Sequence, residues 1–342
     1  MATCEELAVR LTKALKRGPW HVARWREQGA FTGCDLFRAE PVGDDQQRKF
    51  FIKCSSRDER IRLAMAPFNK NEVAFFNGPA RVVQGVAPDC LIGEYQERNG
   101  QSTLVLEWLE TRNSVSFRDG CSAGHAGLVI EAIASIHCTS QALERSGHVT
   151  QDEVLAHINF PQIWEGYARS LGDVLPGVTL CPRRVALGDA VAAEPQMLAE
   201  IFDTGPAMIL HRDLQLDNVL IEQKAGFDLA RLVDWQFWGI GPGGLDLGYF
   251  ILSSLSPEVR RNCEDALTGR YCELIGEQFP HYGPDEVRRD VRRAAIWKLV
   301  VSVFATQMMD NSSPQKRQWR KVDLERLTQF VRDHEITIAD LA

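Results

Sequence analysis

The sequence predicts an α+β protein with two lobes, a small strand-rich N-terminal lobe and a larger, mainly helical C-terminal lobe. The chain has 342 residues, of which 44% are hydrophobic and 25% are charged, and this length can fill two lobes rather than one small core. Strand patterns dominate the first part of the chain, whereas most segments after residue 122 have helical periodicity. We therefore expect the two lobes to cover residues 1–108 and 109–342.

The N-terminal lobe is predicted to begin with an amphipathic helix, because Leu7, Leu11 and Leu15 recur at helical spacing among charged residues. Two strands follow in segments 31–42 and 49–56, and the polar turn between them indicates a hairpin. The lobe also contains a helix and a buried strand, predicted at segments 68–80 and 103–110.

The C-terminal lobe is predicted to be helical except for one region near its middle. The helical segments share apolar periodicity and include residues 123–140, 153–171 and 290–308. The exception consists of short apolar runs of strand length that alternate with polar loops, at residues 206–210, 218–222 and 230–235. Chemistry-bearing side chains cluster in these loops.

Charge and cysteine usage exclude several classes of protein. Lys plus Arg is 39 and Asp plus Glu is 46, so the net charge of -7 argues against a nucleic-acid partner. The nine Cys contain no C-x-x-C pair, and we expect reduced thiols in a cytosolic protein. The most apolar stretch, residues 294–306, is too short to span a bilayer and contains Lys298, so we expect no membrane segment. We expect a monomer or a homodimer.

The strongest chemical signal is the pattern H-R-D-L-x-x-x-N, met by His211, Arg212, Asp213, Leu214 and Asn218. Asp234 follows at the end of the next predicted hairpin. Phosphoryl transfer from ATP requires a group that orients and accepts the proton of the attacking hydroxyl, which fits Asp213. It also requires oxygen ligands for Mg²⁺, which fits Asn218 and Asp234. The alternative is a polar turn before a half-buried acid in an ordinary hairpin, and the spacing favours the catalytic interpretation.

At these residues the sequence resembles the aminoglycoside phosphotransferase family and its choline-kinase and ecdysteroid-kinase-like relatives, which have a protein-kinase-like fold. The triplet DWQ at 234–236, followed by GPGGLDLGYF, is more similar to that family than to protein kinases, which have D-F-G and then A-P-E. The resemblance implies that Asp246 braces the catalytic loop through backbone hydrogen bonds and that His211 supports the same loop. The alternative for Asp246 is an acid satisfied by the free amides of a helix N-terminus.

A kinase also needs a strand lysine that holds the α- and β-phosphates and a helix glutamate that holds this lysine. Lys53 in FFIKC and Glu72 in NKNEVAFF have the required order and spacing. Glu59 is a competing acid, but the family pattern N-E-x-x-F/Y begins at Asn71. The alternative for Lys53 is a solvated charge on a strand edge.

Other nucleotide contacts carry weaker signals. The segment QGAFTGCDL lacks G-x-G-x-x-G, so we expect only a short backbone cradle around Thr32 and Gly33, or else a turn that contacts no ligand. The resemblance implies that TLVLEWLE leads into an interlobe hinge, where the carbonyl of Glu107 and the amide of Leu109 bind the adenine edge. The alternative is a core strand with no ligand.

These observations together predict a kinase that uses ATP or GTP with Mg²⁺ to phosphorylate a hydroxyl of a small molecule. Family resemblance favours an antibiotic or another natural product as the acceptor. The alternatives are a metabolic kinase for choline, a sugar or a steroid alcohol, and a pseudokinase that only binds nucleotide. We expect His137 to be structural and no zinc to bind. The prediction depends on Asp213, Asn218 and Asp234 converging beside Lys53.

Overall fold

The computed structural model describes residues 3–25, 33–43, 48–83, 85–113, 116–140, 153–175, 181–224, 226–308 and 313–341. The chain divides into two compact units, which are described separately. Unit 1 comprises Met1–Glu110 and Asp234–Gln236, and unit 2 comprises Thr111–Val233 and Phe237–Ala342. The first stretch of unit 1 ends two residues after the boundary expected from the sequence. Nothing in the sequence pattern indicated that the DWQ triplet belongs to unit 1.

Unit 1 is built on a five-stranded antiparallel sheet in the order β1-β2-β3-β5-β4. Its strands are β1 (Trp20–Arg24), β2 (Cys34–Pro41), β3 (Phe50–Ser55), β4 (Cys90–Gln96) and β5 (Gln101–Glu107). The predicted hairpin is present as β2 and β3, and Lys53 on β3 is paired with Leu36 on β2 and Leu104 on β5. Lys53 therefore lies on the central strand, where neighbours on both sides fix its backbone.

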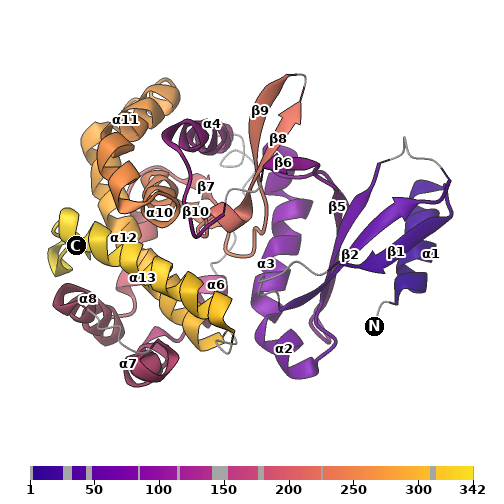
Figure 1. Cartoon of the computed structure of the whole chain (residues 1–342), viewed down its shortest axis with the longest axis horizontal. Helices are drawn as coiled ribbons and strands as arrows, with labels where there is room; N and C mark the ends of the chain where they lie inside the picture. The colour runs from indigo at the N-terminus through magenta and orange to yellow at the C-terminus, as the bar shows by residue number, and fades with distance from the viewer. Residues whose placement is uncertain are drawn as a thin grey trace. The chain divides into compact units, whose positions relative to one another are not determined.

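Helix α1 (Cys4–Leu15) covers one face of this sheet. It begins with a capping box, in which the Thr3 hydroxyl accepts from the Glu6 amide and the Glu6 carboxylate accepts from the Thr3 amide. Leu7 and Leu11 on this helix belong to the same buried cluster as Ile52 on β3. Since side chains alternate across a strand, the next residue of β3 after Ile52 faces the opposite side, where helix α3 lies (Figure 1).

Two helices connect β3 to β4: α2 (Glu59–Ala64) and α3 (Ala66–Asn77), followed by the short helix η1 (Pro79–Arg81). Helix α3 ends where Gly78 and Pro79 were predicted to close it. It buries four apolar and two polar side chains, namely Phe68, Asn69, Glu72, Val73, Phe75 and Phe76. A helix buries polar groups only where partners satisfy them, so the presence of Asn69 and Glu72 in this list points to a site.

Unit 2 contains two small sheets. One has the order β6-β8-β9, with β6 (Thr111–Asn113), β8 (Val219–Lys224) and β9 (Phe227–Leu232); the other pairs β7 (Met208–Leu210) with β10 (Gly239–Gly241). Val219 pairs with Leu232 at the end of the β8–β9 hairpin that lies away from the turn. The next pair in that direction consists of Asn218 and Val233. There the amide of Val233 donates to the carbonyl of Asn218 at 3.0 Å. Asn218 ends the short helix η2 (Leu216–Asn218).

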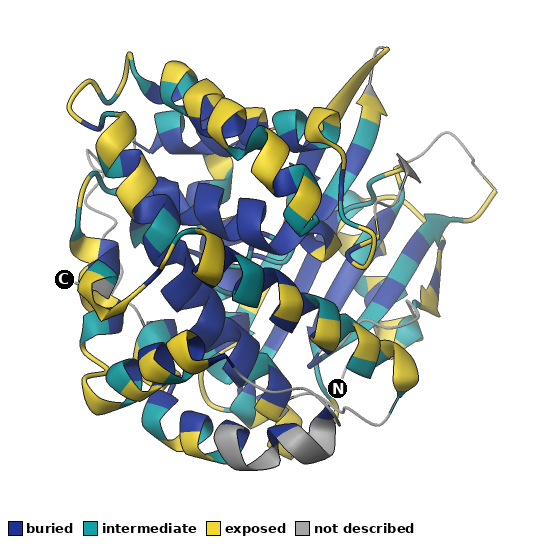
Figure 2. Ribbon diagram, turned by 60° about the vertical axis from the view of Figure 1, so that its left-hand side comes forward, coloured by how far each residue is buried: buried dark blue, intermediate teal, exposed yellow. Residues whose placement is uncertain are grey.

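The rest of unit 2 is helical. Its helices are α4 (Ala123–Thr139), α6 (Glu153–His157), α7 (Phe160–Val174), α8 (Pro182–Ala193), α9 (Met197–Asp203), α10 (Gly244–Ser254), α11 (Pro257–Ile275), α12 (Pro284–Met308), α13 (Pro314–Asp333) and η3 (Ile338–Leu341). Helix α10 is buried at every residue, and exposed residues lie on the helices around it (Figure 2). A Cβ at Gly248 would lie 2.5 Å from the carbonyl of Val291, so glycine permits the close packing of α10 on α12.

The predicted fold class is confirmed, since a strand-rich N-terminal part precedes a mainly helical C-terminal part. One helical prediction needs correction, because segment 153–171 contains two helices rather than one. The side chain of Asn159 accepts from the Gln162 amide and starts α7 as a new helix, with a proline in its first turn. Within the described part of the chain, no helix combines the length and hydropathy needed to cross a membrane.

Candidate active site

A buried ion cluster lies between β3 and α3 in unit 1, and we call it the lysine cluster. The ammonium of Lys53 lies 2.8 Å from a carboxylate oxygen of Glu72 and 2.8 Å from Oδ1 of Asp234. The competing acid Glu59 is 78% exposed and lies 4.0 Å from Arg62 instead. The local sequence produces this arrangement because strand alternation turns Lys53 toward α3 and helical spacing places Glu72 on the buried face.

The charges in the lysine cluster act on one another. Burial alone would lower the pKa of Lys53, but the carboxylates of Asp234 and Glu72 outweigh burial and raise it. Burial raises the pKa of Glu72 to about 7, although the Lys53 ammonium and the backbone amide of Trp235 act in the opposite direction. One ammonium faces two carboxylates, and the Asp234 side chain is 35% exposed. A further cation at Asp234 would therefore fit the charge of the cluster.

The other residues predicted to contact nucleotide lie in unit 1 or outside the described residues. Thr32 is among the residues that are not described. Gly33 is buried, and a Cβ there would lie 2.5 Å from Cγ of Met65, so close packing requires glycine. Glu107 ends β5, where its amide donates to the carbonyl of Asp89 at 2.8 Å. Among the described residues, the amide of Leu109 has no hydrogen-bond partner. The contacts of Glu107 and Leu109 with adenine stay predictions.

Residues 211–218 of unit 2, which we call the catalytic loop for their predicted role, have a strained backbone that is held from two sides. Arg212 has a φ of 63°, which is unfavourable for a residue with a side chain. Asp246 in the first turn of α10 accepts from the amides of His211 at 2.6 Å and Arg212 at 2.8 Å. From α12, the indole of Trp297 donates to the carbonyl of Arg212 at 2.6 Å. These bonds offset the cost of the unusual conformation.

Asp246 is buried, and its surroundings keep it charged. Burial alone would raise its pKa, but the neighbouring imidazole of His137, whose Nε2 lies 3.7 Å from the carboxylate, together with His211 and its backbone amide, lowers it below the usual value. His137 is also buried, and its Nδ1 lies 2.7 Å from the hydroxyl of Tyr271. The carboxylate of Asp246 therefore bonds to amides of the catalytic loop, whereas the alternative was an acid satisfied by its own helix.

Both oxygens of the Asp213 carboxylate have donors in unit 2. The hydroxyl of Tyr249 donates to Oδ1 at 2.7 Å, and the amide nitrogen of Asn218 lies 3.2 Å from Oδ2 and donates to the Asp213 carbonyl at 2.7 Å. His211 supports the loop beside them: its Nδ1 accepts from the Asp213 amide at 3.3 Å, so its Nε2 carries the proton and donates to the Val233 carbonyl at 2.9 Å. This side chain ties the loop to the end of β9.

Sequence reasoning missed a buried chain of polar groups behind Asp213. The ammonium of Lys298 lies 3.3 Å from the Tyr249 hydroxyl and 2.7 Å from a carboxylate oxygen of Asp323, and all three side chains are buried. An ammonium only donates, so the Tyr249 oxygen accepts from Lys298 and its own proton points to Asp213. A lysine in a strongly apolar segment needs a buried partner, and this signal could have revealed the chain of contacts.

The structure thus brings the predicted residues together in two groups. Lys53, Glu72 and Asp234 meet in unit 1, and the second group meets in unit 2: His211, Asp213, Asn218 and Asp246. The convergence of both groups around one nucleotide stays a prediction.

Comparisons with solved structures identify kinases with the same fold. A choline kinase from Cryptosporidium parvum matches with a TM-score of 0.56 at 11% identity, covering 96% of this chain and 95% of that one. A microcompartment-associated aminopropanol kinase matches with a TM-score of 0.55 at 12% identity, covering 94% of each chain. The GDP complex of aminoglycoside 2'-phosphotransferase-IIIa matches with a TM-score of 0.53 at 11% identity, covering 97% of this chain and 100% of that one. At these identities the likeness concerns the fold.

Comparison with curated protein sequences gives no match. A family model, however, matches residues 42–282, which is more than two thirds of the chain and includes the lysine cluster and the catalytic loop. Its description is the ecdysteroid kinase-like family. The sequence motifs, the two groups of contacting residues and this match agree, and the chain is a member of the ecdysteroid kinase-like family.

Proposed function

We propose that this chain transfers the γ-phosphoryl group of ATP or GTP to a hydroxyl of a small molecule in a magnesium-dependent reaction. The observation that carries the proposal is the set of contacts around Asp213: Asp246 braces its loop, and Tyr249 and Asn218 orient its carboxylate. Phosphoryl transfer depends on positioned groups more than on covalent chemistry. The contacts around Asp213 hold its carboxylate in one position.

The nucleotide and its metal fit the groups that each unit offers. In unit 1, Lys53 would hold the phosphates, while Asp234 offers a partly exposed carboxylate. In unit 2, Asn218 uses its amide nitrogen on Asp213, so its amide oxygen is the group left for a metal. Carboxylate and amide oxygens are ligands that suit Mg²⁺, which when bound neutralises charge on the phosphate oxygens.

Asp213 would act as the base for the acceptor. As the acceptor oxygen bonds to the γ-phosphorus and the bond to the β-phosphate bridging oxygen breaks, the hydroxyl proton passes to the Asp213 carboxylate. The products are the phosphorylated acceptor and the nucleoside diphosphate. The donors on Asp213 hold its rotamer during this step, because the Tyr249 hydroxyl donates to Oδ1 and the Asn218 side-chain amide lies 3.2 Å from Oδ2.

We propose an antibiotic or another natural product as the acceptor, with a metabolic alcohol such as choline, a sugar or a steroid alcohol as the alternative. The similar solved structures include a choline kinase, an ethanolamine kinase, an aminopropanol kinase and an aminoglycoside phosphotransferase, so they support both classes. A panel of hydroxylated acceptors from both classes, incubated with Mg²⁺ and labelled ATP or GTP, separates them by which member becomes labelled.

The same assay tests the reaction itself. Asp213→Ala should lower transfer to every acceptor by about a thousandfold while nucleotide binding persists, whereas unchanged turnover in this variant would remove Asp213 from the mechanism. A chain that binds nucleotide but labels no acceptor would instead be a nucleotide-binding module.

A further inference from the structure

The triplet Asp234–Gln236 is fastened to helix α3 by contacts that the proposed chemistry does not explain. The chain enters unit 1 for these three residues only, and each of them contacts a side chain of β3 or α3. Asp234 has a φ of 63°, a conformation that a residue with a side chain adopts at a cost in free energy. Such a conformation persists only when surrounding contacts hold it.

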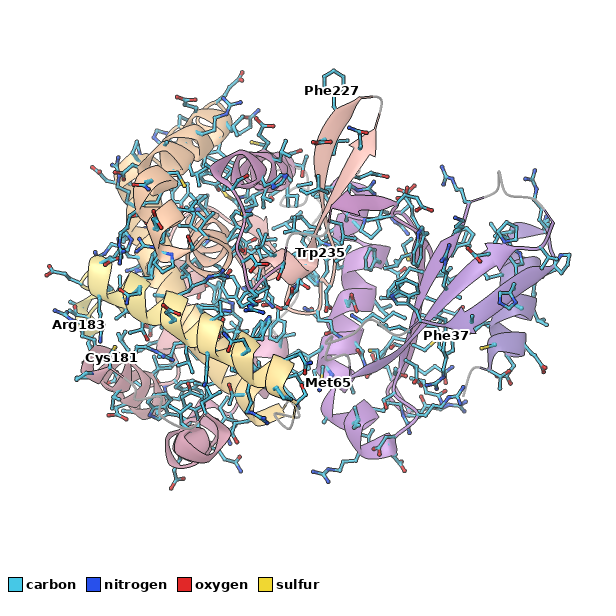
Figure 3. The ribbon with its side chains drawn as sticks, in the orientation of Figure 1. Phe37, Met65, Cys181, Arg183, Phe227 and Trp235 are labelled. Carbon is cyan, nitrogen blue, oxygen red and sulfur yellow. The ribbon has the colours of Figure 1, made fainter. Side chains whose placement is uncertain are left out.

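Trp235 supplies the apolar part of this attachment. Its ring stacks on Phe75 with centroids 3.9 Å apart and an interplanar angle of 7°, and the side chain is fully buried. Its backbone amide also acts on the neighbouring Glu72 carboxyl, whose pKa it lowers. Figure 3 shows Trp235 beside α3. Burial of two aromatic faces makes release of this segment unfavourable.

Gln236 supplies the polar part. Its side-chain amide donates to Oδ1 of Asn69 at 2.9 Å, and its backbone carbonyl accepts from the side-chain amide of Asn71 at 3.0 Å. Asn69 also accepts from the thiol of Cys34 at 3.3 Å, which links the attachment to the first residue of β2. Asn69 and Gln236 are both buried, so their amides lose a strong bond if the segment leaves.

The hydrogen bond between Asn71 and Gln236 connects two motifs of the sequence. The pattern beginning at Asn71 and the triplet ending at Gln236 lie 165 residues apart, yet they are two sides of one contact. A glycine at position 236 could accept from Asn71 through its backbone but could offer Asn69 nothing. The glutamine therefore adds a bond that a D-F-G triplet lacks.

We propose that Asn69, Asn71 and Gln236 are positioning residues that form a clasp, which holds the Asp234 carboxylate in place for a magnesium-bound nucleotide. The inference rests on the proposed function for the identity of the ligand. Helix α3 would then have two functions: it presents Glu72, and it fixes the Asp234 side chain in one conformation.

The test uses Asn71→Ala and Gln236→Ala with Asn77→Ala as a matched control. Asn77 lies on the same helix and donates to the carbonyl of Gly93 at 3.0 Å, the same bond at the same length but away from the triplet. The first readout is hydrogen exchange of the peptide spanning residues 233–237 in nucleotide-free protein. We expect faster exchange in the two clasp variants and unchanged exchange in the control. Unchanged exchange in both clasp variants would overturn the clasp.

The second readout is calorimetric affinity for a non-hydrolysable ATP analogue with and without Mg²⁺. The clasp variants should bind the magnesium complex about tenfold more weakly while their affinity without magnesium changes less than twofold. The double variant Asn69→Ala/Gln236→Ala should bind the magnesium complex no more weakly than Asn69→Ala or Gln236→Ala alone, because both substitutions remove the same hydrogen bond between these two side chains. Equal losses with and without magnesium would mean that these residues only stabilise unit 1. If the wild type binds no analogue, the proposed function fails while hydrogen exchange still decides on the clasp.

Discussion

The two acids assigned to phosphoryl transfer are held in opposite ways. In the lysine cluster of unit 1, Asp234 makes a direct ion pair with Lys53 at 2.8 Å. In the catalytic loop of unit 2, Asp213 accepts from neutral donors, and the cation Lys298 lies behind Tyr249, one contact further away. A metal ligand can share its charge with a lysine, whereas a base must keep a lone pair for the acceptor's proton. The contacts of each acid therefore fit the role proposed for it.

A similar backbone feature lies beside both acids. Asp234 and Arg212 each have a φ of 63°, and in each case buried hydrogen bonds from a neighbouring helix hold the segment. Unit 1 uses amides of α3 for this purpose, and unit 2 uses the carboxylate of Asp246. The strain at both places indicates that these backbone conformations position the two acids at a cost in local stability.

The largest effect is expected for Asp213→Ala. Turnover should fall by about a thousandfold, because the group that accepts the proton is lost, while nucleotide affinity changes less than twofold. Initial rates with labelled ATP and calorimetry on the same preparation measure both quantities. Loss of nucleotide affinity in parallel with turnover would show that the loop serves binding rather than chemistry.

Lys53→Met comes next. The variant leaves the carboxylate of Glu72 buried without its ammonium, so the free energy of unfolding should fall by about 3–5 kcal/mol. Nucleotide binding should be lost as well. Lys49→Met is the control, since Lys49 pairs at 3.2 Å with the exposed carboxylate of Glu110 and should cost less than about 1 kcal/mol. Urea titrations compare the two. Similar losses in both variants would argue against the buried ion cluster.

Tyr249→Phe is expected to have an intermediate effect. Turnover should fall about tenfold with the KM for ATP unchanged, because the Asp213 carboxylate loses the donor on Oδ1. Tyr282→Phe removes an equivalent bond, a buried hydroxyl that donates to Asp290 at 2.7 Å, and should leave turnover unchanged. An equal loss of turnover in both variants would reduce the role of Tyr249 to stability.

The smallest effect on activity is expected for Asp323→Asn, on the order of threefold in turnover, because Asp323 acts through Lys298 and Tyr249. Burial alone would raise the pKa of Asp323, but the Lys298 ammonium lowers it below its usual value of 3.8. The pair therefore stabilises the fold above pH 3.8, and this stability is lost as the pH falls through the lower folded pKa. Urea unfolding should show a wild-type advantage at pH 7 that shrinks below pH 3.8; a constant advantage would contradict the ion pair.

Local patterns predicted much of this molecule. The order and spacing of Lys53 and Glu72 predicted that the two residues pair, as they do at 2.8 Å, and the fixed spacing after His211 predicted a catalytic loop, whose role stays a prediction. Each of these signals lies within a short stretch of the chain. The division at residue 108 rested on the change from strand patterns to helical periodicity along the chain, and it stays a prediction.

Contacts between distant elements were not predictable in the same way. Lys298 meets Tyr249 across 49 residues, and Gln236 meets Asn69 across 167 residues, with no periodic pattern that links either pair. Such contacts depend on how distant elements of the chain pack against one another. No local pattern in the sequence indicates that packing. A lysine in an apolar helix and a glutamine two residues after Asp234 are the local traces that these contacts leave in the sequence.

The central claim is that the chain binds a magnesium nucleotide through Asp234 and Lys53. The most direct measurement is a calorimetric titration of the wild type and of Asp234→Asn with ATP and GTP at several Mg²⁺ concentrations. We expect a magnesium-dependent binding heat in the wild type with at least one nucleotide, and its loss in Asp234→Asn. Absence of magnesium-dependent heat in the wild type with either nucleotide would contradict the claim.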